Sequence, residues 1–265
     1  MSRLWILSIF AIALLLITPF AQAAQKDGLI LFLPLNDGSG DSAANIVGDN
    51  AKVNGASWVS TGRGGGLEFN GKDNSVEIPL DLSPQAPENQ GAMSICAWVK
   101  VLEIGTDTHG QTRQPIVMKG NGGQWEYALY VYDNFGAGLS VWTCAGSGVS
   151  EPSAENTLPK GEWHHTCGTW TVADGVKVYV DGAEVAQRAA DPAKEACDGE
   201  ANIFLAHRED GQFLNAVIDE VAMWDRALSV EEINANMNGE LTIESVAVEP
   251  TGKLATTWAD VRRSY

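Results

Sequence analysis

Apolar and polar residues alternate over short stretches along most of the chain, and glycine, asparagine or aspartate separates these stretches. A period of two indicates half-buried β-strands, and the separating residues are typical of tight turns. The clearest hairpin is 176–186, where Val-Lys-Val-Tyr-Val precedes Asp181-Gly182 and a returning strand. A second hairpin is expected at 67–78 around Asn-Gly-Lys-Asp-Asn, and further strands at 28–35, 94–101, 127–132, 139–144 and 217–224.

A helical pattern is confined to the C-terminal part of the chain. Ser229, with Glu232 three residues later, forms a capping box and predicts a short helix that runs toward Met237. Ten or more short strands joined by hairpin turns favour an all-β fold, a two-sheet antiparallel jelly-roll sandwich with one short helix near the C-terminus.

The N-terminus has the pattern of a secretory signal. Arg3 precedes an apolar run over residues 4–20, and Ala21-Gln22-Ala23 offers the small residues at which signal peptidase cuts. We therefore expect a signal peptide over residues 1–23, a jelly-roll domain over residues 28–239, and a C-terminal strand and helix extension over residues 240–265. An uncleaved membrane anchor is the alternative. No later segment is apolar enough to cross a bilayer, so the mature protein is expected to be extracellular, at the cell surface or periplasmic.

The net charge of −17 excludes whole classes of partner. Nucleic-acid binding depends on clustered Lys and Arg, and docking on anionic lipid needs the same residues. An acidic surface is compatible with divalent cations or simply with solubility.

The four cysteines all follow the expected cleavage site. An even count in an exported chain predicts two disulfides, and four cysteines allow three pairings. No C-x-x-C pair occurs, which argues against a zinc ribbon or a thioredoxin-like motif. The cysteines are Cys96, Cys144, Cys167 and Cys197.

Five motifs, taken in order, resemble the laminin G-like and pentraxin group of concanavalin A-like jelly rolls, and in particular its bacterial secreted members. They are L-F-L-P-L-N-D-G-S-G (31–40), G-G-L-E-F-N-G (65–71), S-I-C-A-W-V-K (94–100), W-H-H-T-C-G-T with V-K-V-Y-V-D-G (163–182) and I-D-E-V-A-M-W with L-S-V-E-E-I (218–233). The resemblance to pentraxins implies a disulfide between Cys96 and Cys167, which leaves Cys144 to pair with Cys197.

The segment Trp163–Trp170 contains two histidines and a cysteine, yet we interpret it as a core strand. His164 and His165 point to opposite faces of a strand, so they cannot bind one metal as neighbours, and no H-E-x-x-H motif accompanies them. Glycoside hydrolases of this fold carry E-x-D-x-x-E on one strand, and the chain has no such motif. A non-catalytic protein is therefore expected.

The resemblance also implies calcium, since jelly rolls of this group often hold Ca²⁺ between an N-terminal loop and the late I-D-x-V strand. We expect Asp219 to share a strand face with Val217, Val221 and Met223, where a buried acid needs a partner. Asp41 is the first choice for a ligand from the loop, and Asn45 the second. The alternative is that Asp219 accepts backbone N–H bonds and Asp41 only shapes a turn.

Exposed aromatic rings would allow the protein to bind sugars by stacking on their C–H faces. The candidates are Trp125, Tyr130, Tyr132 and Trp142, with Asn134 or Arg208 as polar partners. The double-calcium ligand site of pentraxins is not expected, because its positions fall near Gln124-Trp125 and Glu209-Asp210. The leading hypothesis is an exported recognition module that binds a glycan or glycoprotein. The alternatives are a structural or protein–protein interaction module of the envelope or extracellular matrix, and a glycoside hydrolase.

Overall fold

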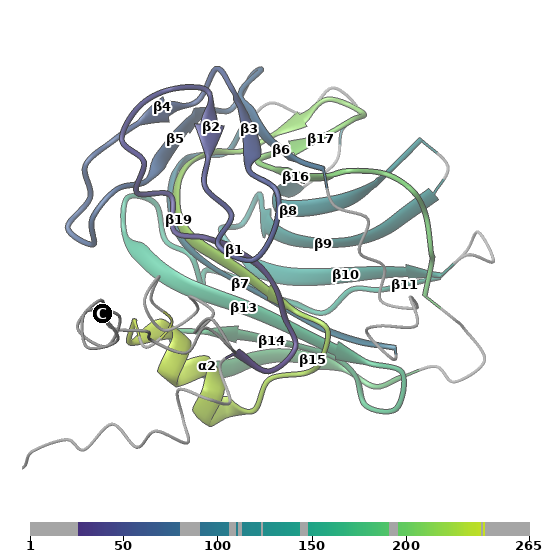
Figure 1. Cartoon of the computed structure of the whole chain (residues 1–265). Coiled ribbons are helices and arrows are strands. Elements are labelled where there is room, and N and C mark those ends of the chain that lie inside the picture. Colours follow the sequence, from purple (N-terminus) through teal and green to yellow (C-terminus); the bar gives the residue numbers. More distant parts are fainter. Residues whose placement is uncertain are drawn as a thin grey trace, which may run out of the picture.

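The computed structural model describes residues 26–79, 91–105, 110, 113–122, 124–143, 148–190, 196–239 and 241. These residues form two large antiparallel sheets that pack face to face as a sandwich, and the helix α2 lies against the outside of one sheet (Figure 1). The predicted all-β jelly-roll architecture is confirmed. The expected signal peptide over 1–23 and nearly all of the extension over 240–265 lie outside the described residues.

The first sheet has eight strands. In spatial order they are β15 (Ala183–Arg188), β14 (Gly175–Val180), β13 (Trp163–Thr171), β7 (Ala92–Glu103), β19 (Asn215–Trp224), β5 (Leu67–Asn70) and β4 (Ser57–Trp58), with β1 (Leu29–Leu33) paired to β19.

The second sheet has nine strands. In spatial order they are β11 (Gly148–Ser150), β10 (Ala137–Thr143), β9 (Gln124–Tyr132), β8 (Arg113–Asn121), β16 (Ile203–Leu205), β6 (Ser75–Ile78), β3 (Ala51–Asn54) and β2 (Ser42–Ala43), with β12 (Ser153–Ala154) paired to β10. A small ribbon of β17 (His207–Arg208) and β18 (Gln212–Phe213) stands beside it.

Alternation of side chains along the strands builds the core between the sheets. In β9, Tyr127, Leu129 and Val131 are buried in the main core cluster, whereas Ala128 and Tyr130 belong to a separate apolar cluster on the outer face. One sheet therefore presents two different surfaces, and its outer face is where a ligand could reach it.

The hairpin predicted at 176–186 is confirmed. Val180 pairs with Ala183, and the two residues between them have positive φ, 49° at Asp181 and 78° at Gly182. Positive φ at both positions is the requirement of a type I′ turn, which matches the twist of the flanking strands.

The hairpin predicted at 67–78 is wrong. Leu67–Asn70 pairs with β4 and β19 in the first sheet, whereas Ser75–Ile78 pairs with β3 and β16 in the second. The Asn70 side chain organises the intervening turn through bonds from the backbone N–H groups of Lys72 and Asp73. The same turn chemistry here carries the chain from one sheet to the other.

The strand face expected for Asp219 also needs correction. Glu220 has a φ of 49°, and the pairing of β19 with β7 shifts between Asp219 and Ala222. This bulge places Val221 and Met223 in the core between the sheets, while Asp219 lies opposite Trp98 on the outer face. Simple alternation fails here because one extra residue reverses the direction of every side chain that follows.

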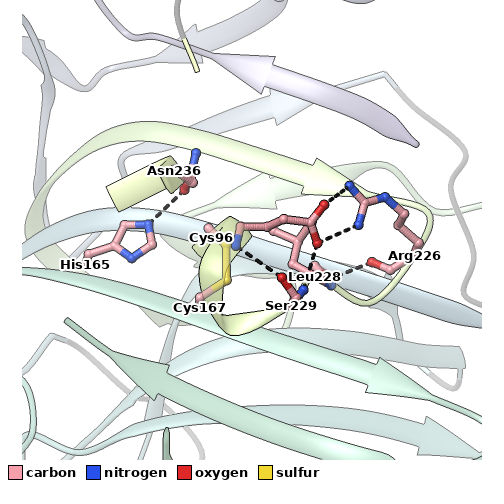
Figure 2. Close-up of a disulfide and its surroundings, with 9 residues drawn as sticks. Cys96, His165, Cys167, Arg226, Leu228, Ser229 and Asn236 are labelled. Carbon is pink, nitrogen blue, oxygen red and sulfur yellow. Dashed lines mark hydrogen bonds and ion pairs between the residues drawn. A yellow bond between two sulfur atoms is a disulfide. The ribbon is translucent and has the colours of Figure 1, made fainter. Parts of the chain in front are cut away.

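The disulfide between Cys96 and Cys167 is confirmed, and it joins directly paired positions of β7 and β13 (Figure 2). Both cysteines are fully buried in an outer-face apolar cluster with Phe32, Tyr179 and Trp224. The bond thus locks the register of the two strands at the centre of the first sheet.

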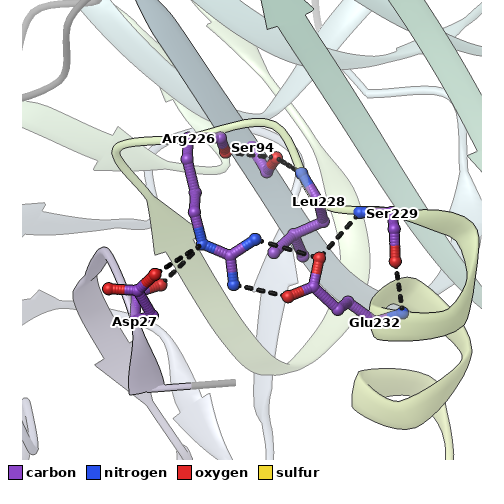
Figure 3. Close-up of polar contacts among 6 residues, drawn as sticks. All are labelled: Asp27, Ser94, Arg226, Leu228, Ser229 and Glu232. Atoms are coloured by element: carbon purple, nitrogen blue, oxygen red, sulfur yellow. Dashed lines mark hydrogen bonds and ion pairs between the residues drawn. The ribbon is translucent and has the colours of Figure 1, made fainter. Parts of the chain in front are cut away.

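The helix α2 (Val230–Met237) begins at the predicted capping box. Glu232 N–H donates to Ser229 Oγ at 3.2 Å, and Ser229 N–H donates to Glu232 Oε2 at 2.8 Å. Arg226 donates two bonds to the same Glu232 carboxylate and a third to the Asp27 carbonyl, so the helix start is tied to the N-terminal strand (Figure 3). Ser94 Oγ donates to the Arg226 carbonyl and accepts from Leu228 N–H, which fixes the connection to the sheet.

Replacing Ser229 with alanine is expected to lower the free energy of unfolding by about 1 kcal/mol, since the first turn of α2 loses its cap. Urea unfolding of Ser229→Ala measures the change, and Ser229→Thr, which keeps the hydroxyl, is the matched control. An alanine variant as stable as the wild type would show that α2 contributes nothing to the cooperative unit.

No helix within the described part of the chain is long and apolar enough to cross a membrane.

Candidate functional site

The four aromatic candidates lie together on the outer face of the second sheet, with three of them around the fourth, Tyr130. Trp125, Tyr132 and Trp142 pack, half-buried, against a small buried cluster of Met118, Ala128 and Tyr130. The centroid of the Tyr130 ring lies 6.2 Å from that of Tyr132 and 6.3 Å from that of Trp142, and both ring pairs meet edge to face. Strands β9 and β10 therefore assemble the aromatic cluster that the sequence suggested.

Two arginines cover this cluster. The guanidinium of Arg208 lies 4.0 Å from the ring centroid of Trp125, and its Nη1 donates to Tyr130 Oη at 3.1 Å. The Arg113 guanidinium lies 5.1 Å from the Tyr130 ring. Because Tyr130 has no exposed surface, its ring supports the others and cannot itself stack on a sugar. One face of Trp125 is likewise occupied by a cation.

Each arginine is also paired with a carboxylate. Arg113 forms an ion pair with Glu151, which accepts a bond from Tyr132 Oη, and Arg208 pairs with Asp210 at 3.1 Å. Burial raises the pKa of Tyr132 to about 12, so its hydroxyl stays a donor at neutral pH. The positive charges of the cluster are thus balanced within it.

A polar pocket of about 310 Å³ opens next to the aromatic cluster, and we call it the carboxylate pocket. It begins where the β8–β9 hairpin meets β17, since Gly120 pairs with Trp125 and Gly122 N–H donates to Glu209 Oε2 at 3.0 Å. Its lining combines two carboxylates, two amides and two rings, namely Glu200, Glu209, Asn121, Asn202, Phe204 and His207.

Buried contacts hold the walls of the carboxylate pocket. Lys119 Nζ, fully buried, lies 2.5 Å from Glu126 Oε1 and also donates to the Gly199 carbonyl, which anchors the segment that carries Glu200. On the other side His207 stacks on Phe213 at 4.6 Å and meets Phe204 edge-on at 5.3 Å. Burial lowers the pKa of His207, so this ring is neutral at pH 7.

Sequence reasoning did not identify the carboxylate pocket. Its residues come from the end of β8, the segment before β16, and β16–β17, so only tertiary packing joins them. The run Phe204-Leu-Ala-His-Arg-Glu-Asp210 was the available signal, because it places an aromatic ring, a histidine and two acids within seven residues.

Asp219 is buried, with 1% of its surface exposed, and neither carboxylate oxygen has a close hydrogen-bond partner among the described residues. Burial, and after it the neighbouring Glu220 carboxylate, raise its pKa to about 7, and the Glu220 backbone, Arg63 and Thr61 partly offset these effects. Arg63 bonds Glu220 at 2.8 Å and lies over the Trp98 ring at 3.7 Å. A buried carboxylate without a close partner is expected either to bind a proton or to bind a cation.

The other two calcium candidates are placed differently. Asn45 Oδ1 accepts the N–H groups of Phe32 and Val47 at 3.2 and 3.3 Å, so this oxygen holds the loop after β1. Asp41 is exposed, and its backbone carbonyl accepts from Val53 N–H. Among the described residues no three His, Cys, Asp or Glu side chains come close enough to hold one metal ion.

The two histidines of β13 have the separate environments expected of opposite faces. His164 lies 2.7 Å from Asp181, whereas His165 is 1% exposed and its Nε2 lies 2.8 Å from Asn236 Oδ1 on α2 (Figure 2). Burial lowers the pKa of His165 to about 4. The contacts of these two histidines therefore stabilise the hairpin and the packing of α2 on the sheet, and the two rings do not converge on one metal site.

Cys144 lies outside the described residues, so its bond to Cys197 stays a prediction. Cys197 is buried, and its N–H donates to the carbonyl of Trp142, two positions before Cys144.

Comparison with known proteins identifies the family. A family model described as the concanavalin A-like lectin/glucanases superfamily, of the laminin G type, matches residues 70–234. No match was found among curated proteins.

Many solved structures share the fold. The binding domain of Paraclostridial Mosquitocidal Protein 1 is 14% identical, with a TM-score of 0.63 over 81% of this chain and 53% of that one. The ligand binding domain of botulinum neurotoxin serotype D, in complex with N-acetylneuraminic acid, is 15% identical, with a TM-score of 0.62 over 83% and 52%.

A Trypanosoma rangeli sialidase in complex with sialic acid is 18% identical, with a TM-score of 0.59 over 81% and 33%. The chain thus spans about half or less of the length of these structures. At such identities the likeness shows the fold alone, whereas the family model covers more than half of the chain. The chain belongs to the laminin G-like family of the concanavalin A-like lectin/glucanases superfamily.

Proposed function

We propose that this protein is an exported, non-catalytic carbohydrate-binding module whose ligand site is the carboxylate pocket. The observation that carries the proposal is the lining of that pocket, in which a half-buried Phe204 ring stands beside the Asn121 and Asn202 amides and two exposed carboxylates. A binding role is consistent with the structural neighbours, two of which are toxin binding domains. Export is supported by the N-terminal signal pattern and by the buried disulfide, a bond of oxidising compartments.

These groups complement the chemistry of a sugar. Carboxylates accept hydrogen bonds from hydroxyl groups, amides both donate and accept, and an aromatic ring packs on the apolar C–H face of a pyranose. The wall segments are held by the buried Lys119 and by the stack of His207 on Phe213. The site is therefore preformed, which lowers the entropic cost of binding.

The charge of the pocket favours a glycan without acidic groups. Glu200 and Glu209 both face the ligand space, and the whole chain carries a charge of −17. The two arginines of the neighbouring aromatic cluster, Arg113 and Arg208, are already paired with Glu151 and Asp210, and Lys119 in the pocket wall is paired with Glu126. A sialylated ligand, of the kind found on the neurotoxin neighbour, would therefore be repelled here.

Glycoside hydrolysis is a second candidate, favoured by the same two carboxylates in one pocket. Such enzymes use one carboxyl group as a general acid, and burial in an apolar setting raises its pKa for that task. Glu200 and Glu209 are both exposed, and Glu209 accepts a backbone N–H from Gly122. Their surroundings suit hydrogen bonding to a ligand better than proton transfer.

Calcium forms a further part of the proposal, as a structural ion bound through Asp219. Ca²⁺ takes roughly six to eight oxygen ligands, and the two unpartnered oxygens of Asp219 fit that need. Asp41 would supply a further oxygen, while Asn45 Oδ1 is already engaged by two backbone N–H groups.

Screening the mature protein on a glycan array, in parallel with Ca²⁺ and with EDTA, is expected to show selective binding of neutral glycans. Asn202→Ala should weaken the best ligand by about tenfold, equal to roughly 1.4 kcal/mol, because an orienting amide is lost. Glu155→Gln, at an exposed position away from the pocket, is the control. Isothermal titration calorimetry gives the affinities, and loss of binding in EDTA would support the calcium part.

Three outcomes would contradict the proposal. Silence of a folded protein across the array would favour a protein partner. Preference for sialylated glycans would refute the charge argument. Release of nitrophenol from nitrophenyl glycosides, abolished in Glu200→Gln or Glu209→Gln, would establish the hydrolase instead.

A further inference from the structure

A second pocket, of about 460 Å³, lies at the edge strand of the first sheet and has no residue in common with the carboxylate pocket. The loop after β1 and the turn between β4 and β5 form it. Its principal lining residues are Asn36, Gly38, Trp58, Ser60, Gly64 and Gly65, and we call it the Trp58 pocket.

Trp58 provides a fixed aromatic wall. Its ring is half-buried and packs against the main core, opposite Leu67 on β5. The indole Nε1–H donates to the Gly40 carbonyl at 2.8 Å, so the ring is held from both sides while it borders the pocket. A ring fixed in this way loses little conformational entropy when a ligand packs against it.

The floor of the Trp58 pocket requires glycine. Gly64 has a φ of 135°, and a Cβ there would lie 2.6 Å from Asn36 Oδ1. A Cβ on Gly65 would lie 2.6 Å from the Leu35 carbonyl oxygen, and Gly65 N–H donates to Asn36 Oδ1 at 2.5 Å. The two loops therefore approach each other closely with only the Asn36 side chain between them, and this contact fixes the Asn36 amide.

Leu35, directly before Asn36, adopts a strained conformation. Its φ is 53°, in the left-handed region that costs a leucine about 1–2 kcal/mol, and its side chain is fully buried in the core. Burial of the side chain stabilises the strained backbone, and the strained backbone in turn directs Asn36 toward Gly65. Strain retained by surrounding packing is a common property of ligand sites.

We propose that the Trp58 pocket is a second sugar site and that it binds one uncharged pyranose ring. Neither the Asn36 Nδ2 nor the Ser60 hydroxyl has a hydrogen-bond partner in the described part of the chain, so both are free to bind sugar hydroxyls. No lining residue is ionisable, which disfavours acidic and amino sugars. The indole supplies the surface for the C–H face of the ring.

This site is independent of the proposed function of the carboxylate pocket. Two sites on separate sheets would allow one chain to bind two units of a polysaccharide, and the second contact would then be intramolecular and raise the overall avidity.

Saturation-transfer NMR with the methyl glycosides of glucose, galactose and mannose tests the proposal. We expect one of them to receive saturation from the wild type and from Asn202→Ala. That variant loses an amide of the carboxylate pocket and its bond to Glu77, and it keeps every residue that lines the Trp58 pocket. Ser60→Leu lies at an exposed position, so it leaves the core intact, and it should fill the Trp58 pocket. Combined with Asn202→Ala, it should abolish the signal that Asn202→Ala alone retains. Trp58→Phe should weaken binding by about tenfold.

Gly62→Ala is the matched control on the same turn, since its Cβ would meet no atom within 4 Å and its backbone is not left-handed. No saturation of any of the three glycosides would overturn the proposal. A signal that survives Ser60→Leu and disappears in Asn202→Ala would also overturn it, because the binding would then belong to the carboxylate pocket. Circular dichroism of each variant verifies that it is folded.

Discussion

Replacing Cys96 and Cys167 together with alanine is expected to lower the free energy of unfolding by about 4 kcal/mol. The bond closes a loop with a sequence separation of 71, and the loop-entropy relation gives this magnitude for a chain segment of that length. A single domain is usually stable by only 5–15 kcal/mol, so the loss is a large fraction of the total.

Urea unfolding of the wild type and the double variant measures this loss. The midpoint should fall, and the m-value should rise because the unfolded chain, freed of its cross-link, exposes more surface. Both cysteines are fully buried beside Phe32 and Tyr179, so removal of their sulfur atoms adds a packing cost. Ser229→Ala, measured in the same way, gives a smaller expected loss of stability with which the effect of the double variant can be compared. Equal stability of the wild type and the double variant would show that the bond does not form in the purified protein.

Local rules succeed in this chain where one short segment determines the outcome. Asp181-Gly182 needs only its own backbone to form a type I′ turn, and Ser229 with Glu232 needs only one helical turn to form the capping box. The resemblance to pentraxins supplied the Cys96–Cys167 bond, which a sequence pattern alone left as one of three pairings.

The same rules fail where tertiary packing selects between locally equivalent choices. The turn at Asn70 suits a hairpin, yet the two flanking strands pair with neighbours in separate sheets. The bulge at Glu220 is invisible in a sequence, because nothing about a glutamate marks a positive φ. The carboxylate pocket and the Trp58 pocket combine residues from distant segments, and only the completed sandwich brings them together.

The pH dependence of stability should identify the ionisation state of Asp219. In EDTA, Asp219→Asn is expected to be more stable than the wild type at pH 8, by up to about 4 kcal/mol, and similar to it near pH 4. Burial, together with the Glu220 charge, raises the pKa of Asp219 to about 7 in the folded state, from an ordinary value of 3.8. The folded protein thus binds this proton more tightly than the unfolded chain does. The stability that the carboxyl group contributes is complete below pH 4, falls as the pH rises through 7, and is absent above that.

Urea unfolding at intervals between pH 4.5 and 8 measures the difference between wild type and variant. Glu184→Gln, at an exposed position on β15, is the control for the removal of one carboxyl group. A constant difference across the range would mean that Asp219 ionises normally and that the bulge at Glu220 admits solvent. Addition of Ca²⁺ then distinguishes a carboxyl group that only binds a proton from one that also binds a cation. A cation bound through Asp219 would stabilise the wild type at pH 8 and stabilise Asp219→Asn much less, since the amide offers one uncharged oxygen in place of a charged carboxylate.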